Sequence, residues 1–242
     1  MESLENTVKI ATINQWIRDG DRWWLLGPQR TPEWFEARRY RITASAAYTA
    51  TGKSKFSTAD QLAGELLGTI APKELNDAMM CGIMYEDEAR DHYIRTSGID
   101  ASTVVEVAFI VWERYPHLGV SPDGIVGNDG MLEIKCPKTM YAPLAAVMAA
   151  VASGNPDPRR NTDYVFAGRP THIWASHYTQ MQMQMAIAGR QWCDYVVYAF
   201  EDGLLYTERI PFNIKYWEWT LGHLTRFIAT HLRDRRPLCP WK

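Results

Sequence analysis

The stretch Ser121-Pro122-Asp123-Gly124, followed shortly by Met131-Leu132-Glu133-Ile134-Lys135-Cys136, determines how the middle of this chain is expected to fold. The second segment is apolar except for Glu133 and Lys135, which is typical of a short buried strand. Alternate side chains of a strand leave by the same face, so these two charged groups lie side by side. Charges in a buried strand are costly unless they are paired or bound to a metal. The stretch therefore indicates a functional site as well as a strand.

The residues between the two segments predict a hairpin. Gly127-Asn128-Asp129-Gly130 is a strong turn signal, and a hairpin through it brings Asp123 alongside Glu133. Two carboxylates and the amine of Lys135 then converge at one edge of a sheet. A Glu and a Lys two residues apart are, by themselves, more typical of a surface hairpin with a paired salt bridge. The preceding Ser-Pro-Asp-Gly motif and the apolar surroundings favour the functional interpretation.

This set of groups is suited to the cleavage of phosphodiesters. Carboxylate oxygens prefer Mg²⁺ or Mn²⁺ to zinc, so Asp123 and Glu133 are predicted metal ligands, with the backbone carbonyl of Ile134 as a further ligand. Such a metal activates a water and stabilises the charge that develops on a scissile phosphate. Lys135 would orient this water or accept its proton, and would help to neutralise the phosphate.

Composition and charge restrict the class of protein. The chain has 242 residues, and its 46% of hydrophobic residues are enough for a sizeable core; no Pro/Gly/Ser-rich linker divides it, so we expect one domain over residues 1–242. A net charge of −2 argues against a protein that binds nucleic acid non-specifically through its overall field. The four cysteines form no CxxC or compact metal spacing, which fits reduced thiols in a cytosolic protein. The sequence shows no signal peptide and no apolar run of membrane length.

The remaining patterns predict a mixed sheet flanked by helices, an α/β fold of the α+β kind. Helices are expected over residues 31–40, from about 57 to 68, over 74–96, over 171–189 and from about 213 onward, and a turn or second helix opens at 42–45. Strands are expected over 104–112, 118–126, 131–136, 192–200 and 204–210. Residues 1–30 are poorly patterned, and residues 149–170 resemble a loop.

Two of the expected helices carry candidate functional residues. In the helix over 74–96, Glu86 shares a face with small and aromatic residues, and although such a carboxylate is more often a salt-bridged structural group, its position before the hairpin favours a functional role. The helix over 171–189 has an apolar stripe that is typical of a protein core, formed by Trp174, Tyr178, Met181, Met185 and Ala188. Its glutamines, Gln180, Gln182 and Gln184, either cap the edge of this core or bind a phosphate or base.

Four segments resemble, in the same order, those of the phage-type alkaline exonucleases, the lambda exonuclease family that is also called the YqaJ-like viral recombinases. The segments are Trp34-x3-Arg38-x3-Ile42-Thr43-Ala44-Ser45, Gly82-x2-Tyr85-Glu86-x2-Ala89-Arg90, Ser121-Pro122-Asp123-Gly124 with Leu132-Glu133-Ile134-Lys135-Cys136-Pro137, and Tyr178-x-Gln180-x-Gln182. Together they extend over about residues 31–200. The resemblance implies a restriction-endonuclease-like core of the PD-(D/E)xK superfamily.

The resemblance also implies an activity. Members of this family digest duplex DNA from a 5′-phosphorylated end with Mg²⁺, and leave a 3′ single strand for recombination by strand annealing. Mn²⁺ is an alternative metal, and two ions are implied. Family members form a ring-shaped homotrimer through which DNA passes, and they work with a phage single-strand annealing protein. The resemblance therefore implies a phage- or prophage-encoded enzyme in the cytoplasm of a bacterial host, without a membrane partner.

The resemblance assigns roles to individual residues of this chain. Asp123, Glu133 and Glu86 would be catalytic metal ligands, and Lys135 would be the base that handles the water. The positions that hold the terminal 5′-phosphate are matched by Arg38, Ser45, Ser121 and Gln180, and Gln182 is a candidate for support of the active site. A guanidinium binds two phosphate oxygens at once, and hydroxyl and amide groups donate to the others.

Two other functions remain open from the sequence. Another nuclease of the same superfamily, either an endonuclease or a repair nuclease with an iron–sulfur cluster, would share the core, although the cysteine spacing argues against a cluster. A non-catalytic recombination scaffold that binds DNA ends would also keep the fold. The presence of every acidic and basic residue of the site argues against this second alternative.

Overall fold

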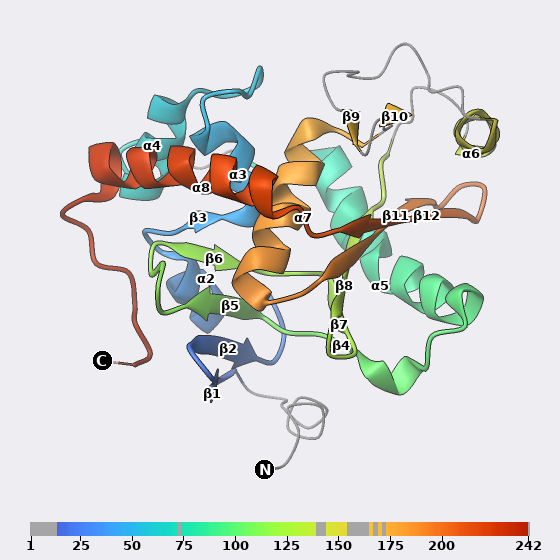
Figure 1. Ribbon diagram of the computed structural model, residues 1–242, viewed down its shortest axis with the longest axis horizontal. Coiled ribbons are helices and arrows are strands. Elements are labelled where there is room, and N and C mark those ends of the chain that lie inside the picture. Colours follow the sequence, from blue (N-terminus) through green and yellow to red (C-terminus); the bar gives the residue numbers. More distant parts are fainter. Residues whose placement is uncertain are drawn as a thin grey trace.

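The computed structural model describes residues 14–71, 74–138, 144–153, 165–166, 169–170 and 173–241. Two five-stranded mixed sheets stand on either side of one helix, α7 (Ala175–Ala188), as Figure 1 shows. The strand order is β1-β2-β5-β6-β3 in the first sheet and β12-β11-β8-β7-β4 in the second. The expected α+β arrangement is confirmed, with its strands divided between two sheets.

The first sheet contains a hairpin that the sequence pattern did not indicate. Its strands are β1 (Gln15–Asp19), β2 (Arg22–Leu26), β5 (Phe109–Trp112), β6 (Leu118–Val120) and β3 (Ile42–Thr43). The β1–β2 hairpin lies in the stretch expected to be irregular. Because β1 is an edge strand without a fully buried side chain, it has no clear alternation of apolar and polar residues.

The second sheet contains the predicted hairpin. Its strands are β4 (Val104–Val105), β7 (Gly124–Val126), β8 (Gly130–Lys135), β11 (Trp192–Ala199) and β12 (Leu204–Pro211). Strands β7 and β8 are antiparallel, and Gly124 lies opposite Leu132. The parallel neighbour of β8 is β11, in which Tyr195 lies opposite Glu133. This register places the motif at the centre of the sheet.

Two strands that were expected to be continuous are broken. The range 104–112 divides into β4 and β5, and the range 118–126 divides into β6 and β7, so that each half belongs to a different sheet. The second break falls at Ser121-Pro122-Asp123, where the proline has no amide hydrogen to donate to a neighbouring strand. The chain therefore crosses between the sheets at the residues of the motif.

The helices largely follow their sequence signals. They are α2 (Pro32–Arg38), α3 (Ala44–Ala50), α4 (Ala59–Leu67), α5 (Asp77–Ser97), α6 (Leu144–Ala152) and α8 (Ile214–Phe227), with single helical turns η1 (Ala101–Thr103) and η2 (Ile228–Leu232). The stretch 149–170, expected to be a loop, contains the end of α6 and the paired strands β9 (Val165–Phe166) and β10 (Arg169–Pro170); its other residues lie outside the described residues, apart from Ser153. No helix of the described part of the chain is long and apolar enough to span a membrane.

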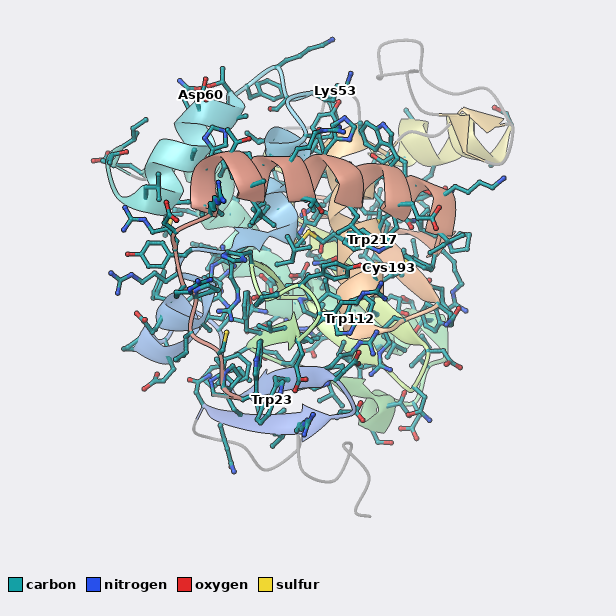
Figure 2. All side chains as sticks on the ribbon, turned by 60° about the vertical axis from the view of Figure 1, so that its left-hand side comes forward. Trp23, Lys53, Asp60, Trp112, Cys193 and Trp217 are labelled. Carbon is teal, nitrogen blue, oxygen red and sulfur yellow. The ribbon has the colours of Figure 1, made fainter. Side chains whose placement is uncertain are left out.

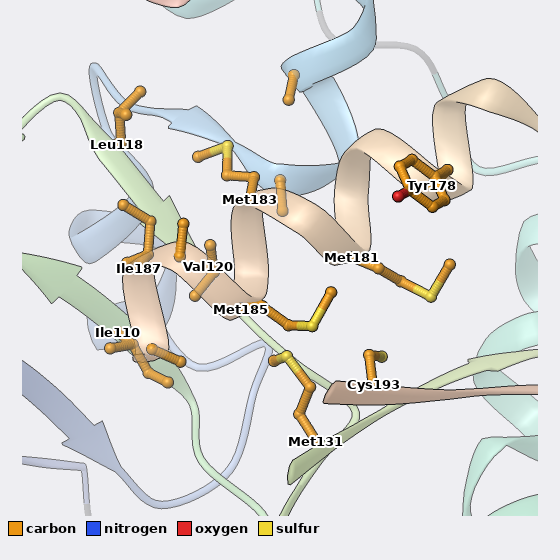
Figure 3. Packing of buried hydrophobic residues seen from close by; sticks show 14 of the residues in the cluster. Ile110, Leu118, Val120, Met131, Tyr178, Met181, Met183, Met185, Ile187 and Cys193 are labelled. Carbon is orange, nitrogen blue, oxygen red and sulfur yellow. The ribbon is translucent and has the colours of Figure 1, made fainter. Parts of the chain in front are cut away.

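Helix α7 forms the centre of the main core. Nearly all of its side chains are buried, and they face both sheets (Figure 3). Ile187 lies toward Ile110 and Val120 of the first sheet, and Met181 and Met185 lie toward Cys193 and Met131 of the second. A helix that is buried on all sides belongs inside a protein. Trp174 was expected in the buried stripe, but it lies just before the helix and is exposed. Figure 2 shows Trp217 of α8 over this core and Trp23 on the distant β1–β2 hairpin.

Candidate active site

The hairpin places Asp123 beside Glu133, as its turn predicts. The backbone N–H of Asp123 donates to the carbonyl of Leu132 at 3.2 Å. The N–H of Ile134 donates to Asp123 Oδ2 at 2.6 Å. Asp123 lies where the chain crosses from β6 to β7 and is half-buried.

Glu133 is enclosed and fully hydrogen-bonded. Its side chain is 1% exposed, yet each oxygen has a partner. Oε1 accepts from the Lys135 ammonium and from Gln180 Nε2 at 2.6 Å. Oε2 accepts from Gln184 Nε2 at 2.8 Å. Two glutamines of α7 thus connect the central helix to the central strand, and they satisfy a carboxylate that would otherwise be expensive to bury.

Helix α5 contributes the third carboxylate. Glu86 accepts from Arg90 at 3.1 Å, and Arg90 also donates to the backbone carbonyl of Asp123 at 2.9 Å. The guanidinium of Arg30, in the loop before α2, lies 3.5 Å from the second oxygen of Glu86. Glu86 is therefore brought to Asp123 by Arg90 and is held from the other side by Arg30.

The three carboxylates and Lys135 perturb one another. Burial, followed by repulsion from Glu133 and Glu86, raises the pKa of Asp123 well above its usual range. Burial also raises the pKa of Glu86, against the pull of Arg90 and Arg30. For Lys135, burial opposes the charge, but attraction to Glu133 and Asp123 is stronger and raises its pKa. Negative charge is thus concentrated here beyond what one lysine neutralises.

The chemistry of this donor set fits a hard divalent cation. All three acidic groups offer oxygen ligands, and a cation would relieve the repulsion between Asp123 and its neighbours. Among the described residues, no three His, Cys, Asp or Glu side chains already converge on one point as a metal site. Oxygens of Glu133 and Glu86 instead accept hydrogen bonds from Lys135, Gln180 and Arg90.

A second group of residues surrounds Arg38 at the end of α2. Its guanidinium lies 4.0 Å from the ring centre of Trp34, and the indole N–H of Trp34 donates to Ser121 Oγ at 2.8 Å. Ser121 Oγ in turn donates to the carbonyl of Ala108 at 2.7 Å. Burial, together with the nearby charge of Arg30, lowers the pKa of Arg38 to about 10. Two neighbouring guanidinium groups beside a partly buried aromatic ring favour an anion at this place.

The structure brings some of the sequence-predicted residues together and separates others. Gln180 lies at Glu133, and its Oε1 is 3.4 Å from Lys135 Nζ. Ser45 is exposed, with its hydroxyl 3.3 Å from that of Thr43. No hydrogen bond within the described residues joins Arg38, Ser45 and Gln180 to one another. Ser121 donates its hydroxyl proton to the carbonyl of Ala108 and accepts from the indole of Trp34, so in this conformation it cannot donate to a phosphate.

Gln182 is not part of this group. Its amide donates to the carbonyl of Pro211 at 3.0 Å and accepts from the N–H of Asn213 at 2.7 Å, so it holds the start of α8. The supporting role at Glu133 belongs to Gln184, which sequence analysis left without a role in the site. The signal was present in the spacing, because Gln184 is one turn after Gln180 and therefore shares its face.

Arg30 is the other residue that sequence analysis missed. It has φ of 64°, a left-handed conformation that is uncommon for a residue with a side chain. Its neighbours maintain this conformation: Gln29 donates to the carbonyl of Pro122 at 3.1 Å, and Thr31 caps α2. Backbone strain that the surroundings impose is often found at functional sites. Here the strain directs a guanidinium to Glu86.

The chain is similar to known proteins over most of its length. The family profile of the YqaJ-like viral recombinase domain matches residues 33–191. The crystal structure of an alkaline exonuclease, LHK-Exo from Laribacter hongkongensis, has 30% sequence identity and a TM-score of 0.63, and the match covers 84% of this chain and 94% of that one. The same enzyme in complex with dAMP matches with a TM-score of 0.64, at the same identity and coverage.

A more distant similarity concerns the fold alone. A phage-related exonuclease from Haemophilus somnus 129PT has 12% identity and a TM-score of 0.53, and the match covers 81% of this chain and 96% of that one. No match was found among the curated proteins.

The crowding of carboxylates makes a prediction about stability. We expect Asp123→Asn to raise the free energy of unfolding by about 0.5–2 kcal/mol in the presence of a chelator, because it removes a repelled charge while keeping an oxygen for the N–H of Ile134. Thermal unfolding at pH 8, followed by circular dichroism, measures the change. Asp129→Asn, in the exposed turn of the same hairpin, is the control and should leave the unfolding temperature unchanged. A lower unfolding temperature for Asp123→Asn would contradict this account of the site.

Proposed function

Because this chain belongs to the YqaJ-like viral recombinase family, we propose that it is a Mg²⁺-dependent exonuclease that digests duplex DNA from a 5′-phosphorylated end and leaves a 3′ single strand. The observation that supports the proposal is that Asp123, Glu133, Glu86 and Lys135 lie near β8 of the second sheet, where the three carboxylates act on one another and Lys135 pairs with Glu133. The relative from Laribacter hongkongensis, an alkaline exonuclease, was crystallised in complex with dAMP, a 5′-mononucleotide.

We propose that Asp123, Glu133 and Glu86, with the carbonyl of Ile134, hold the Mg²⁺ or Mn²⁺. Bound there, two such ions would supply Lewis acidity at the scissile phosphate and an activated water. Glu133 is pre-positioned for this role because Gln184 holds its Oε2. A cation held by the carboxylates would leave the amide of Gln180 and the ammonium of Lys135 free to contact the substrate.

Lys135 is proposed to orient the attacking water and to neutralise the phosphate. Its carboxylate neighbours raise its pKa, so the protonated ammonium is the favoured form beside Glu133 and Asp123. A protonated ammonium donates to a water or a phosphate oxygen, which favours the orienting role over that of a base. Lys135 could act as a base only after the negative charges of Glu133 and Asp123 were neutralised, because these charges raise its pKa.

The group around Arg38 is proposed to receive the terminal 5′-phosphate. The guanidinium lies over Trp34 and senses the charge of Arg30, and Arg30 and Gln180 in turn contact Glu86 and Glu133. Ser45 offers an exposed hydroxyl. Ser121 would donate to the phosphate only after turning its proton away from Ala108. We propose that the anchored 5′ end lies next to the cleavage site.

The family also supports a biological setting. We propose that the chain acts as a single exonuclease domain over residues 1–242, in a ring-shaped homotrimer, with a single-strand annealing protein, in the cytoplasm of a bacterial host. The described residues support one domain because α7 packs against both sheets. The alternative is an endonuclease of the same superfamily. Closed circular duplex DNA distinguishes the two, since an endonuclease cuts it and an exonuclease leaves it intact.

Loss of the Lys135 ammonium should strongly reduce the digestion of duplex DNA. We expect Lys135→Ala to reduce the Mg²⁺-dependent release of nucleotides from linear duplex DNA by about 100-fold or more, because the phosphate loses its neutralising and orienting donor. A duplex labelled separately at each 5′ and 3′ end reports both the rate and the polarity. Lys138→Ala, whose ammonium pairs with exposed Asp77 at 2.7 Å, is the control. Wild-type digestion by Lys135→Ala would refute the proposed site.

Loss of the Arg38 guanidinium, which lies over Trp34, should weaken the preference for 5′-phosphorylated DNA ends. We expect Arg38→Ala to reduce the ratio of digestion rates for 5′-phosphorylated and 5′-hydroxyl ends by about tenfold, since a charge-assisted contact to phosphate contributes roughly 1.5–3 kcal/mol. Competition between the two ends in one reaction measures this ratio directly. An unchanged ratio would remove Arg38 from the phosphate pocket even if the overall rate fell.

Arg30 should couple cation binding to phosphate binding. If its guanidinium turned from Glu86 to a 5′-phosphate, Glu86 would be left to bind a cation more strongly. We expect a phosphorothioate duplex with a 5′-phosphate to raise the affinity for Ca²⁺ by about fivefold or more over a 5′-hydroxyl duplex, and Arg30→Gln to remove this difference. Calorimetric titration measures it without turnover. Arg18→Gln, which breaks an exposed pair with Glu113 at 3.2 Å, is the matched control. A difference that persists in Arg30→Gln would exclude the coupling.

A further inference from the structure

The C-terminal segment returns across the molecule to the first sheet. After η2, residues 233–241 leave the end of α8 and run down past the end of α2 toward the β1–β2 hairpin (Figure 1). Trp241 lies against Trp23, with 6.3 Å between the ring centres. The ring of His117 is 3.1 Å from the carbonyl of Arg235. The segment is therefore packed on the protein along its length.

A buried arginine holds this segment in place. The side chain of Arg41 is fully buried, and its Nε donates to the carbonyl of Pro116 at 2.8 Å. Its two other nitrogens donate to the carbonyls of Ala37 and Leu238. Burial lowers the pKa of Arg41 to about 10, and no carboxylate among the described residues pairs with it. A buried charge without a counter-ion is costly, so the path of the segment depends on a specific and expensive contact.

This path brings positive charges together at the end of α2. The guanidinium of Arg235 lies 5.7 Å from the ring centre of Tyr40, and that of Arg39 lies 4.9 Å from the same ring. Arg236 is close enough to contribute, after burial and with Arg41, to lowering the pKa of His117. We call Arg39, Arg235 and Arg236 the tail patch; all three are exposed.

The charges of the tail patch are poorly neutralised by the protein. Arg39 is 3.8 Å from Glu36, but both side chains are more than half exposed, so water screens the pair. Among the described residues, neither Arg235 nor Arg236 forms an ion pair. The whole chain carries a net charge of −2, so this local concentration of guanidinium groups contrasts with the rest of the molecule. Such a patch attracts a polyanion.

We propose that the tail patch binds the phosphate backbone of the DNA whose 5′ end enters the site, an inference that rests on the proposed function of Arg38. Arg38 and Tyr40 are two residues apart, so their Cα atoms are at most about 7.6 Å from each other. The tail patch therefore gathers around a residue that is only two positions along the chain from Arg38. Guanidinium groups suit phosphate oxygens, and a backbone contact needs no base sequence.

The salt dependence of binding tests the proposal. We expect Arg235→Gln/Arg236→Gln to lower the affinity for a 5′-phosphorylated duplex about tenfold at physiological salt, and to reduce the slope of log K against log salt by roughly 1.8, because about 0.9 is lost with each phosphate contact. Fluorescence anisotropy with Ca²⁺ at a series of NaCl concentrations measures both quantities. Arg235→Lys/Arg236→Lys keeps the charge and should restore most of the slope.

Matched controls separate the tail patch from general charge. Lys53→Gln/Lys55→Gln removes two exposed positive charges from the loop between α3 and α4, and should leave the slope unchanged. Unfolding temperatures equal to that of the wild type establish that each variant is folded. A wild-type slope in folded Arg235→Gln/Arg236→Gln overturns the proposal. So does unchanged DNA binding with lost affinity for a purified annealing protein, which would assign the surface to a protein partner.

The two proposals fail in different ways. The tail-patch variants should digest DNA at low salt with an unchanged preference for 5′-phosphorylated ends, because Arg38 and the carboxylates remain. If the wild-type protein digested no DNA, the proposed function would fail while the salt slopes would remain measurable. If the wild-type protein digested DNA as expected but Arg235→Gln/Arg236→Gln kept the wild-type salt slope, only the proposal for the tail patch would be wrong.

Discussion

The structure depends on the need to satisfy one buried carboxylate. Glu133 lies on the central strand of the second sheet and is almost completely enclosed, and a carboxylate in such a place must be hydrogen-bonded or bound to a cation. Its partners come from Lys135 of its own strand and from Gln180 and Gln184 of α7. The hydrogen bonds from Gln180 and Gln184 that stabilise the buried Glu133 therefore also join α7 to the second sheet. Fold and site are connected through this group.

The same requirement explains the other charged residues near the motif. The protein supplies its own cations: Lys135 at Glu133, and Arg90 and Arg30 at Glu86. Burial, with repulsion from Glu133 and Glu86, still raises the pKa of Asp123. Under the proposed function, a divalent ion would offset the remaining negative charge, and the groups it displaced would be free to contact a phosphate.

Sequence patterns predicted the parts of the fold that local chemistry controls. The turn at residues 127–130 and the alternation around Glu133 were sufficient for the hairpin, and the register placed Asp123 correctly. Patterns failed where tertiary context decides. The break at Pro122 assigns the two halves of one apolar run to different sheets, and Gln182 and Gln184 differ only in which side of a fully buried helix they face. No periodicity distinguishes sides when every side is buried.

Residues 38–41, at the end of α2 and just after it, show why the type of charge alone does not reveal function. Arg38 is the last residue of the helix and lies over Trp34, Arg39 and Tyr40 turn outward, and Arg41 is buried beneath the C-terminal segment. The helix end separates them, because Tyr40 takes a left-handed conformation with φ of 58° and the chain reverses before β3. Arg41 of this short run is a structural anchor, and under the proposals above Arg38 serves an inner phosphate pocket and Arg39 an outer DNA-binding surface. Burial and partners, not sequence spacing, distinguish the three arginines, and they would make the short run the link between the proposed active site and the surface that DNA approaches.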